Sequence, residues 1–282
     1  MSDNDARSAP HASSATPEVM DGIRSLHERI DELHRLLTQR LETEGVEAGS
    51  WLHTHAETVY RPAWRRKTEG EVRWPVALVT AVGIALQLAV PERLLIVSPA
   101  WVFPAAQGVL LIVLVAVNPH RINRESTFLR WLSLALAAMI SLANGYSAAL
   151  LCIGITRGTM GKDPRQLLVT GAFIWLTNIV VFGLWYWEFD RGGPVARALN
   201  LQNRYPDFQF PQMTSPPMMV PPDWEPAFFD YLYLAFTNAT AFSPTDVMPL
   251  SRWAKLAMTV QSLISIVTVA LVVARAVNIL PS

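Results

Sequence analysis

The feature that most constrains this 282-residue chain is a series of long apolar runs separated by short polar connections. Each run has close to the roughly 20 residues that an α-helix needs to cross the hydrocarbon layer of a membrane. The sequence therefore predicts an all-α membrane protein. We expect transmembrane helices over about 75–92, 100–118, 131–155, 167–187 and 254–279.

A shorter apolar run precedes the last of these helices, within residues 227–246. Its apolar part, Ala227 to Phe242, has only 16 residues and is followed by hydroxyl residues, a proline and Asp246. Such a run is too short for a comfortable crossing. Non-helical backbone at membrane depth is tolerated only where it is buried in protein or lines water. The pattern predicts a re-entrant segment, giving about five transmembrane helices plus this segment.

The distribution of Lys and Arg leaves a second topology open. Basic residues collect on the cytoplasmic side of membrane proteins, and a cytoplasmic N-terminus places the cluster from Arg61 to Arg73 on that side. After four crossings, residues 188–226 are cytoplasmic as well. Either the 227–246 segment then enters from the cytoplasm, or Phe228–Ser243 spans fully and the protein has six transmembrane helices.

Composition excludes several functions. Hydrophobic residues make up 51% of the chain and the formal net charge is zero, so we expect no nucleic-acid partner. The single cysteine, Cys152, cannot form an intrachain disulfide. The membrane segments contain no His/Cys/Asp cluster, no nucleophile with a base and no Gly-rich phosphate loop, so we expect neither an enzyme nor a bound cofactor or metal. No cleavable signal is predicted in residues 1–18.

The soluble N-terminal part divides into three segments. Residues 1–18 are polar and predicted to be a disordered tail, and 46–74 mix aromatic and basic residues, which favours an interfacial linker. Residues 19–45 predict a helix, either a short coiled coil that assembles subunits or an amphipathic helix packed on the rest of the protein. Its apolar residues fall at steps of four and three: Val19, Ile23, Leu26, Ile30, Leu33 and Leu37.

The membrane part divides into residues 75–166, with three helices, and 167–282. The second portion comprises the helix 167–187, a turret 188–226, the re-entrant segment 227–246 and the inner helix 254–279. Seven prolines between Tyr205 and Pro226 exclude a continuous regular helix there. Acidic residues near these junctions are candidates for an ion vestibule, although marking the water interface is the simpler interpretation. They are Glu188, Asp190 and Asp230.

Oxygen-bearing side chains gather in and after the short apolar run. Hydroxyl and amide oxygens can replace part of an ion's hydration shell, and a carboxylate sets a negative potential at one mouth of a pore, a combination that suits cations. These residues are Thr237, Asn238, Thr240, Ser243, Thr245 and Asp246.

The last helix carries a polar stripe at helical spacing. Gln261, Ser265 and Thr268 follow one another at steps of four and three and therefore share one face. A water-filled pathway would require such a stripe. Hydrogen bonding between packed helices explains it equally well.

The order of a helix, a re-entrant segment with Thr240, the sequence Asp246-Val-Met-Pro249 and an inner helix resembles the two-helix pore module of the potassium-channel family. In that family a threonine-rich filter is followed by Gly-Asp, two residues and Pro. Three stretches, Trp185–Pro194, Pro206–Met213 and Asp230–Leu280, are also similar to a set of uncharacterised bacterial membrane proteins.

The filter positions depart from the channel pattern. Both glycines of the family's filter are absent, and proline restricts its own backbone and that of the residue before it. The resemblance therefore implies altered selectivity or none. The five positions hold Ala241, Phe242, Ser243, Pro244 and Thr245.

We expect an ion-channel-like protein of the bacterial inner membrane with a cytoplasmic N-terminus. It would pass or gate monovalent cations through a homo-oligomeric pore, such as a tetramer, surrounded by membrane lipids. The alternative is a non-conducting membrane scaffold or interaction protein of the same fold.

Overall fold

The computed structural model describes residues 62–117, 119–122, 126–160, 163–200, 205–240 and 246–279, together with nine residues between Ser25 and Gln39. The chain divides into two units, Met1–Arg61 and Pro62–Ser282. In the first unit the nine described residues are all helical and exposed, including Leu33 of the predicted seam. The rest of the predicted 19–45 helix, the 1–18 tail and most of the 46–74 linker lie outside the described residues.

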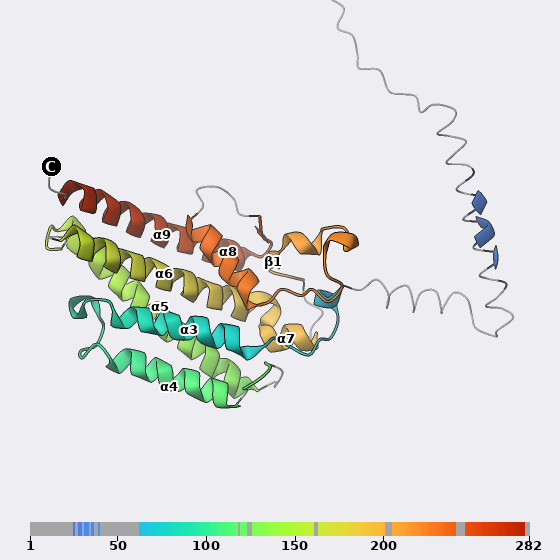
Figure 1. The fold of residues 1–282 in the computed structure, drawn as a ribbon, viewed down its shortest axis with the longest axis horizontal. Helices are drawn as coiled ribbons and strands as arrows, with labels where there is room; N and C mark the ends of the chain where they lie inside the picture. The colour runs from blue at the N-terminus through green and yellow to red at the C-terminus, as the bar shows by residue number, and fades with distance from the viewer. Residues whose placement is uncertain are drawn as a thin grey trace, which may run out of the picture. The chain divides into compact units, whose positions relative to one another are not determined.

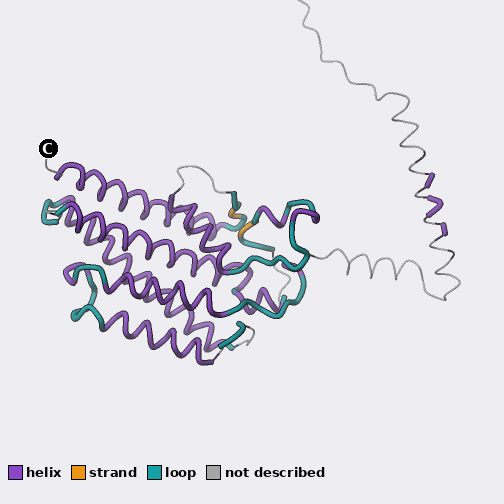
Figure 2. Tube along the Cα trace, in the orientation of Figure 1, coloured by secondary structure: helices purple, strands orange, loops and turns teal. Residues whose placement is uncertain are grey.

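The second unit is a helical bundle joined by short 3₁₀ turns and one small ladder (Figures 1 and 2). It begins at Pro62, inside the segment predicted as a linker. The α-helices are α3 (Arg73–Leu88), α4 (Val102–Val117), α5 (Thr127–Thr156), α6 (Pro164–Phe189), α7 (Pro194–Leu199), α8 (Phe228–Thr240) and α9 (Arg252–Ile279). The strands are β1 (Phe208–Gln209) and β2 (Met248–Pro249). The 3₁₀ turns are η1 (Ala63–Arg65), η2 (Glu92–Leu94), η3 (Asp190–Gly192), η4 (Pro211–Met213) and η5 (Pro217–Met219).

The helices α3 and α4 form an antiparallel pair with a polar contact inside it. Gln87 and Gln107 exchange two side-chain hydrogen bonds, of 2.9 and 3.2 Å, and both residues are buried. In an apolar environment amide groups satisfy each other because no water is available. The pair therefore fixes how the two helices meet near their connection.

The helix α6 occupies the middle of the bundle, in contact with α3, α5, α8 and α9 (Figure 1). Its start follows local rules: Asp163 caps the helix by accepting a hydrogen bond from Arg165 N, and Pro164 takes the first helical position. The helix itself carries the two largest fully buried side chains of the core, Trp187 and Tyr186. The carboxyl end of α6 is the place where the functional segments meet.

The chain changes direction sharply after α6. Arg191 has a φ of 51° and Gly193 a φ of 100°, and Pro194 then begins the short α7. A positive φ is cheap for glycine but strained for a residue with a side chain, so contacts around Arg191 must hold it. The 188–226 segment, predicted as a turret, thus contains a helix and a strand. Within its proline-rich part, from Tyr205 to Pro226, β1 and the two short turns η4 and η5 are the described elements.

Three helices are long and apolar enough to cross a membrane, by length and composition: Thr127–Thr156, Pro164–Leu199, which joins α6 to α7, and Arg252–Ile279. The expected helices over 75–92 and 100–118 are present as α3 and α4, but each has only 16 residues. At 1.5 Å per residue each is about 24 Å long, less than the roughly 30 Å hydrocarbon core. The described part of the chain is therefore an all-α protein with three candidate spans, fewer than the five expected.

Candidate functional site

The segment from Ala227 to Leu250, which we call the α8 hairpin, starts and ends at the same end of α6. At its start, Phe228 N donates a 2.9 Å hydrogen bond to Glu71, and Tyr231 Oη donates a 2.6 Å bond to Asp190 Oδ2. At its finish, β2 pairs antiparallel with β1, and Leu250 N donates a 2.8 Å bond to Asp207 O. The hairpin enters the bundle and comes back to the place where it began.

The tip of α8 reaches the middle of α9. Ser265 Oγ donates a 2.8 Å hydrogen bond to Ala239 O, one residue before α8 ends. Ser265 is the fourteenth of the 28 residues of α9, so the last turn of α8 lies halfway along that helix. Beside it, Asn238 Nδ2 donates to Met258 O and to Gln261 Oε1, at 3.0 and 2.7 Å.

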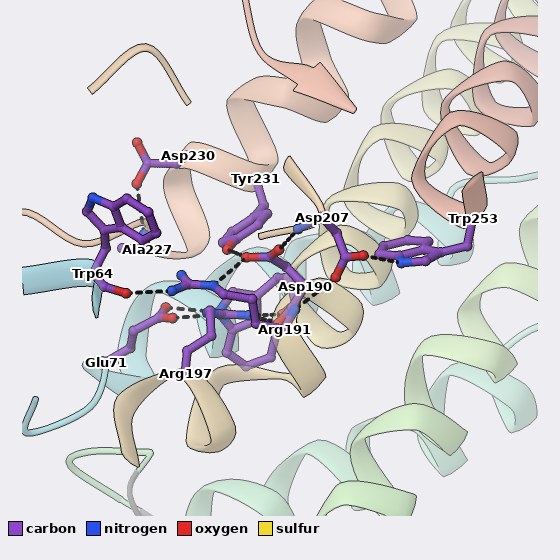
Figure 3. A network of polar contacts seen from close by, with 11 residues as sticks. Trp64, Glu71, Asp190, Arg191, Arg197, Asp207, Ala227, Asp230, Tyr231 and Trp253 are labelled. Atoms are coloured by element: carbon purple, nitrogen blue, oxygen red, sulfur yellow. Dashed lines mark hydrogen bonds and ion pairs between the residues drawn. The ribbon is translucent and has the colours of Figure 1, made fainter. Parts of the chain in front are cut away.

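Asp190 and Asp207 form the centre of the network that holds the two ends of the hairpin (Figure 3). Asp190 is fully buried, and its Oδ1 accepts a 2.8 Å hydrogen bond from Asp207 N. Asp207 in turn accepts from Arg191 N at 3.0 Å and from Trp253 Nε1, in the first turn of α9, at 2.7 Å. These bonds join α6, β1, α8 and α9 in one cluster and hold Arg191 in its unusual conformation.

An ion pair closes the other side of the network. Arg197 Nη2 donates a 2.8 Å bond to Glu71, and both side chains are less than one tenth exposed. Arg197 also donates to the carbonyl oxygens of Trp187 and Asp190 and lies over the Tyr231 ring, 4.9 Å from its centroid. A buried charge needs such partners because desolvation is costly. The segment before α3 is thereby bound to the carboxyl end of α6.

Another carboxylate, that of Glu225, lies near this network. Thr68 Oγ1 donates a 2.9 Å hydrogen bond to Glu225. Burial raises the pKa of the Glu225 carboxyl above its usual value, and the Thr68 hydrogen bond opposes part of that rise. Folding therefore disfavours the ionised form of Glu225 relative to the unfolded chain.

The candidate ion-pathway residues fall into two groups. The hydroxyls of Thr237 and Thr240 donate to carbonyl oxygens of the preceding turn of α8, and Asn238 is buried against α9. Asp246 is exposed and lies two residues before β2. The filter positions Ala241, Phe242, Ser243, Pro244 and Thr245 lie outside the described residues.

The polar stripe on α9 points into the bundle. Gln261, Ser265 and Thr268 are at most 3% exposed. Gln261 Oε1 accepts a 2.7 Å bond from Tyr186 Oη as well as the bond from Asn238, and Ser265 accepts a 2.6 Å bond from Trp175 Nε1. In this chain, hydrogen bonding between packed helices therefore accounts for the burial of the stripe, in line with the second of the two interpretations of the sequence.

The vestibule candidates also have internal roles. Glu188 is 4% exposed and accepts a hydrogen bond from Ser133, and Asp190 is held within the network described above. Asp230 accepts a 2.8 Å bond from Ala227 N and thereby caps the start of α8. Neither Glu188 nor Asp190 faces open water in this chain, because both carboxylates serve as acceptors inside the protein.

The sequence-based interpretation missed a different polar face of α9. The polar residues that line a groove beside the α8 hairpin are Asn238 and Thr240 of α8 and Lys255, Thr259, Ser262 and Ser265 of α9, together with apolar residues. Steps of four and three put Lys255, Thr259 and Ser262 on one helical face. That spacing was available in the sequence, but only the packing against α8 shows that these residues line the groove.

Among the residues that the structure describes, no group of three or more His, Cys, Asp or Glu side chains could hold a metal ion. The arrangement defines a helical membrane protein with an internal hairpin. No family model, curated protein or solved structure matches this chain.

Proposed function

We propose that this protein is an ion-channel-like membrane protein in which the α8 hairpin enters the membrane from one side and lines part of a cation pathway. The observation that carries the proposal is the hydrogen bond from Ser265 to Ala239, which puts the end of a 13-residue helix halfway along the 28-residue α9. If α9 crosses the membrane, the tip of α8 lies near its midplane.

The polarity of α8 favours a cation at its tip. The carboxyl end of a helix carries a partial negative charge, which favours a cation nearby. Thr240 is the last residue of α8 and is exposed, and exposed Asp246 lies two residues before β2. The groove residues Thr259 and Ser262 add hydroxyl oxygens on the facing side of α9.

We further propose that α3, α4, α5, α6 and α9 all cross the membrane and that the hairpin opens to the cytoplasm. The helices alternate in direction, so Arg73, Arg121 and Arg130 lie at the same end as the hairpin's two anchors, whereas Arg93 and Arg157 lie at the other. The excess of basic residues favours a cytoplasmic location for the anchored end.

We also propose that the protein forms a homo-oligomer. The apolar residues Leu256, Leu263 and Val277 of α9 are each more than half exposed in the single chain. A pore between subunits would cover part of such a surface, and lipid would cover the rest. The number of subunits, with a tetramer as the expectation, is part of the proposal.

The alternative is a non-conducting scaffold of the same fold. It is favoured by the internal hydrogen bonds of Gln261 and Ser265, which bind these two side chains to neighbouring helices. The two functions differ in one measurable property, the passage of ions.

Flux measurements test the proposal. The protein is reconstituted in liposomes and K⁺ and Na⁺ flux are measured for the native chain, for Asp246→Asn and for the control Asp223→Asn, an exposed acid outside the hairpin. We expect flux in the native chain, a several-fold decrease in Asp246→Asn and no change in the control. Absence of flux for every monovalent cation favours the scaffold.

Cysteine labelling tests the hairpin separately. In a Cys152→Ala background, single cysteines replace Asp223, Leu250 or Arg157, all exposed positions. A membrane-impermeant maleimide should label positions 223 and 250 from the same side and position 157 from the opposite side. Labelling of 223 and 250 from opposite sides would mean that the segment traverses the membrane, and the pathway proposal would be abandoned.

A further inference from the structure

A second feature of the bundle is a cavity of about 250 Å³ beside the carboxyl end of α6, away from the groove of the α8 hairpin. Its walls come from the starts of α3 and α5, the ends of α4 and α6, and the start of α7. A water molecule occupies roughly 30 Å³ in the liquid, so the cavity has room for a small polar group. Its charged lining residues are Arg73, Arg130 and Glu188.

Arg73 is the unusual member of this lining. Its side chain is buried, with the residue only 7% exposed, and its Nε has no hydrogen-bond partner among the described residues. No acid of the described chain pairs with it within 4.0 Å, although Glu188 lies near enough to act on it electrostatically. A buried guanidinium nitrogen without a hydrogen-bond partner is costly. The cavity in front of it is the place where an anionic partner would fit.

The other groups around the cavity add positive potential. Arg130 is exposed at its edge and is held by a hydrogen bond from Nη1 to Gly192 O. Ser126 and Thr127, at the amino-terminal end of the 30-residue α5, also line it, and Ser126 makes no side-chain capping bond. The first turn of a helix leaves backbone N–H groups unpaired and carries partial positive charge. Both features favour an anion.

The charges of the lining residues indicate the charge of the ligand. Arg73 and Arg130 are two basic residues against the single acid Glu188, so the formal charge of the lining is +1. Glu188 already accepts the Ser133 hydrogen bond and does not pair with either arginine within 4.0 Å. A single monoanionic group neutralises this charge. A phosphodiester is such a group. The planar guanidinium group of arginine can donate two parallel hydrogen bonds to phosphate oxygens.

The aromatic residues beside the cavity indicate where that phosphodiester comes from. Trp74 follows Arg73, and Phe128 and Trp131 bracket Arg130; all three side chains are more than 60% exposed. Exposed aromatic residues at the ends of membrane helices lie in the headgroup layer, the level at which lipid phosphates are found. The cavity therefore lies at the depth of the lipid phosphates if α3 and α5 cross the membrane.

We propose that this cavity binds the phosphodiester of an anionic phospholipid, with Arg73 and Arg130 as its charged ligands. This site does not depend on ion conduction by the α8 hairpin. It is a specific lipid site within the fold, distinct from general solvation by the bilayer.

The test uses purified, delipidated protein in a neutral detergent. Short-chain phosphatidylglycerol is titrated, and binding is measured by native mass spectrometry and by the rise in thermal unfolding temperature. Short-chain phosphatidylcholine, inorganic phosphate and glycerol 3-phosphate are titrated in parallel. We expect saturable binding of phosphatidylglycerol, weaker binding of phosphatidylcholine, and no comparable effect of the two soluble anions.

Variants locate the site. Arg73→Gln and Arg130→Gln should each weaken phosphatidylglycerol binding by about tenfold or more, the effect of losing a charge-assisted hydrogen bond. The control Arg252→Gln removes an exposed arginine from the same end of the bundle, outside the cavity, and should bind as the native chain does. Arg73→Gln should also unfold at the same or a higher temperature without lipid, because a buried charge whose Nε lacks a hydrogen-bond partner is gone.

Two results would overturn the proposal. Equal lipid affinity in Arg130→Gln, Arg252→Gln and the native chain would place the lipid elsewhere, even if Arg73→Gln failed to fold. Soluble phosphate that binds as tightly as the lipid would mean that the cavity takes a free anion and that the lipid is not its source.

Discussion

Tyr231 of α8 donates a 2.6 Å hydrogen bond to Asp190 at the carboxyl end of α6, and both residues are fully buried. These two residues lie 41 positions apart in the sequence. Their contact joins the start of the α8 hairpin to Asp190. The same carboxylate accepts a hydrogen bond from Asp207 N, and the strand β1 that follows Asp207 pairs with β2 at the end of the hairpin. One carboxylate thus fixes both the entry and the return of the hairpin.

Tyr231→Phe should destabilise the protein. The substitution removes the shorter of two hydrogen bonds to Asp190 Oδ2 and leaves the 3.3 Å bond from Arg191 Nε, and the loss of a buried hydrogen bond costs about 1–3 kcal/mol. Thermal unfolding in detergent measures the loss. The control Tyr233→Phe removes the hydroxyl of a tyrosine that is 54% exposed two residues further along the same helix. If both variants unfold at the same temperature, the Asp190 contact does not contribute as described.

The Gln87–Gln107 pair predicts a non-additive effect. Gln107→Leu alone leaves the amide of Gln87 unpaired in an apolar place and should cost about 1–3 kcal/mol. Replacing both by Leu removes both polar groups and should restore most of the stability. A double-mutant cycle on the unfolding free energy measures the coupling. Additive losses would show that the two side chains do not satisfy each other.

Two helical glycines should respond in opposite directions. A Cβ at Gly171 of α6 would lie 2.8 Å from Val272 Cγ1 of α9, so Gly171→Ala should separate these helices and cost about 1–3 kcal/mol. At Gly145 of α5 nothing lies within 4 Å of the added atom, and Gly145→Ala should stabilise the helix by about 0.5–1 kcal/mol. Unfolding temperatures compare the two. Rescue of Gly171→Ala by Val272→Ala would identify the contact responsible.

The Glu225 carboxyl predicts a pH effect on stability. Because burial raises its pKa in the folded state, folding favours the protonated form. This contribution is fully present below the usual glutamate pKa of about 4.3 and is lost as pH rises through the raised value. Glu225→Gln should therefore be more stable than the native chain near neutral pH, and the difference should vanish at low pH. A difference independent of pH would contradict this.

Gln261 should stabilise α8 in its position against α6 and α9. It accepts bonds from Tyr186 and Asn238 and donates a 2.8 Å bond to Ala235 O, so it joins α6, α8 and α9. Gln261→Leu leaves Tyr186 and Asn238 without this acceptor and should increase hydrogen exchange along α8. Ser262→Ala, the neighbouring position with weaker 3.2 Å bonds, is the matched control. Unchanged protection of α8 in Gln261→Leu would assign the hairpin's stability to its anchors alone.

The sequence by itself determined the helical class and the approximate positions of the long helices. The expected segments 131–155, 167–187 and 254–279 correspond to α5, α6 and α9, each a few residues longer than predicted. This was possible because apolar length is a local property: a run near 20 residues needs no distant partner to be recognised. The short length of α8 was visible for the same reason.

Tertiary structure alone decided what the polar residues do. The spacing of Gln261, Ser265 and Thr268 showed that they share a face, but only packing against α6 and α8 made that face internal. Glu71 and Arg197 pair across 126 positions. A carboxylate, amide or hydroxyl has the same chemistry at a pore and in a core. The distinction depends on which distant segment supplies its partner, and only the folded chain brings those segments together.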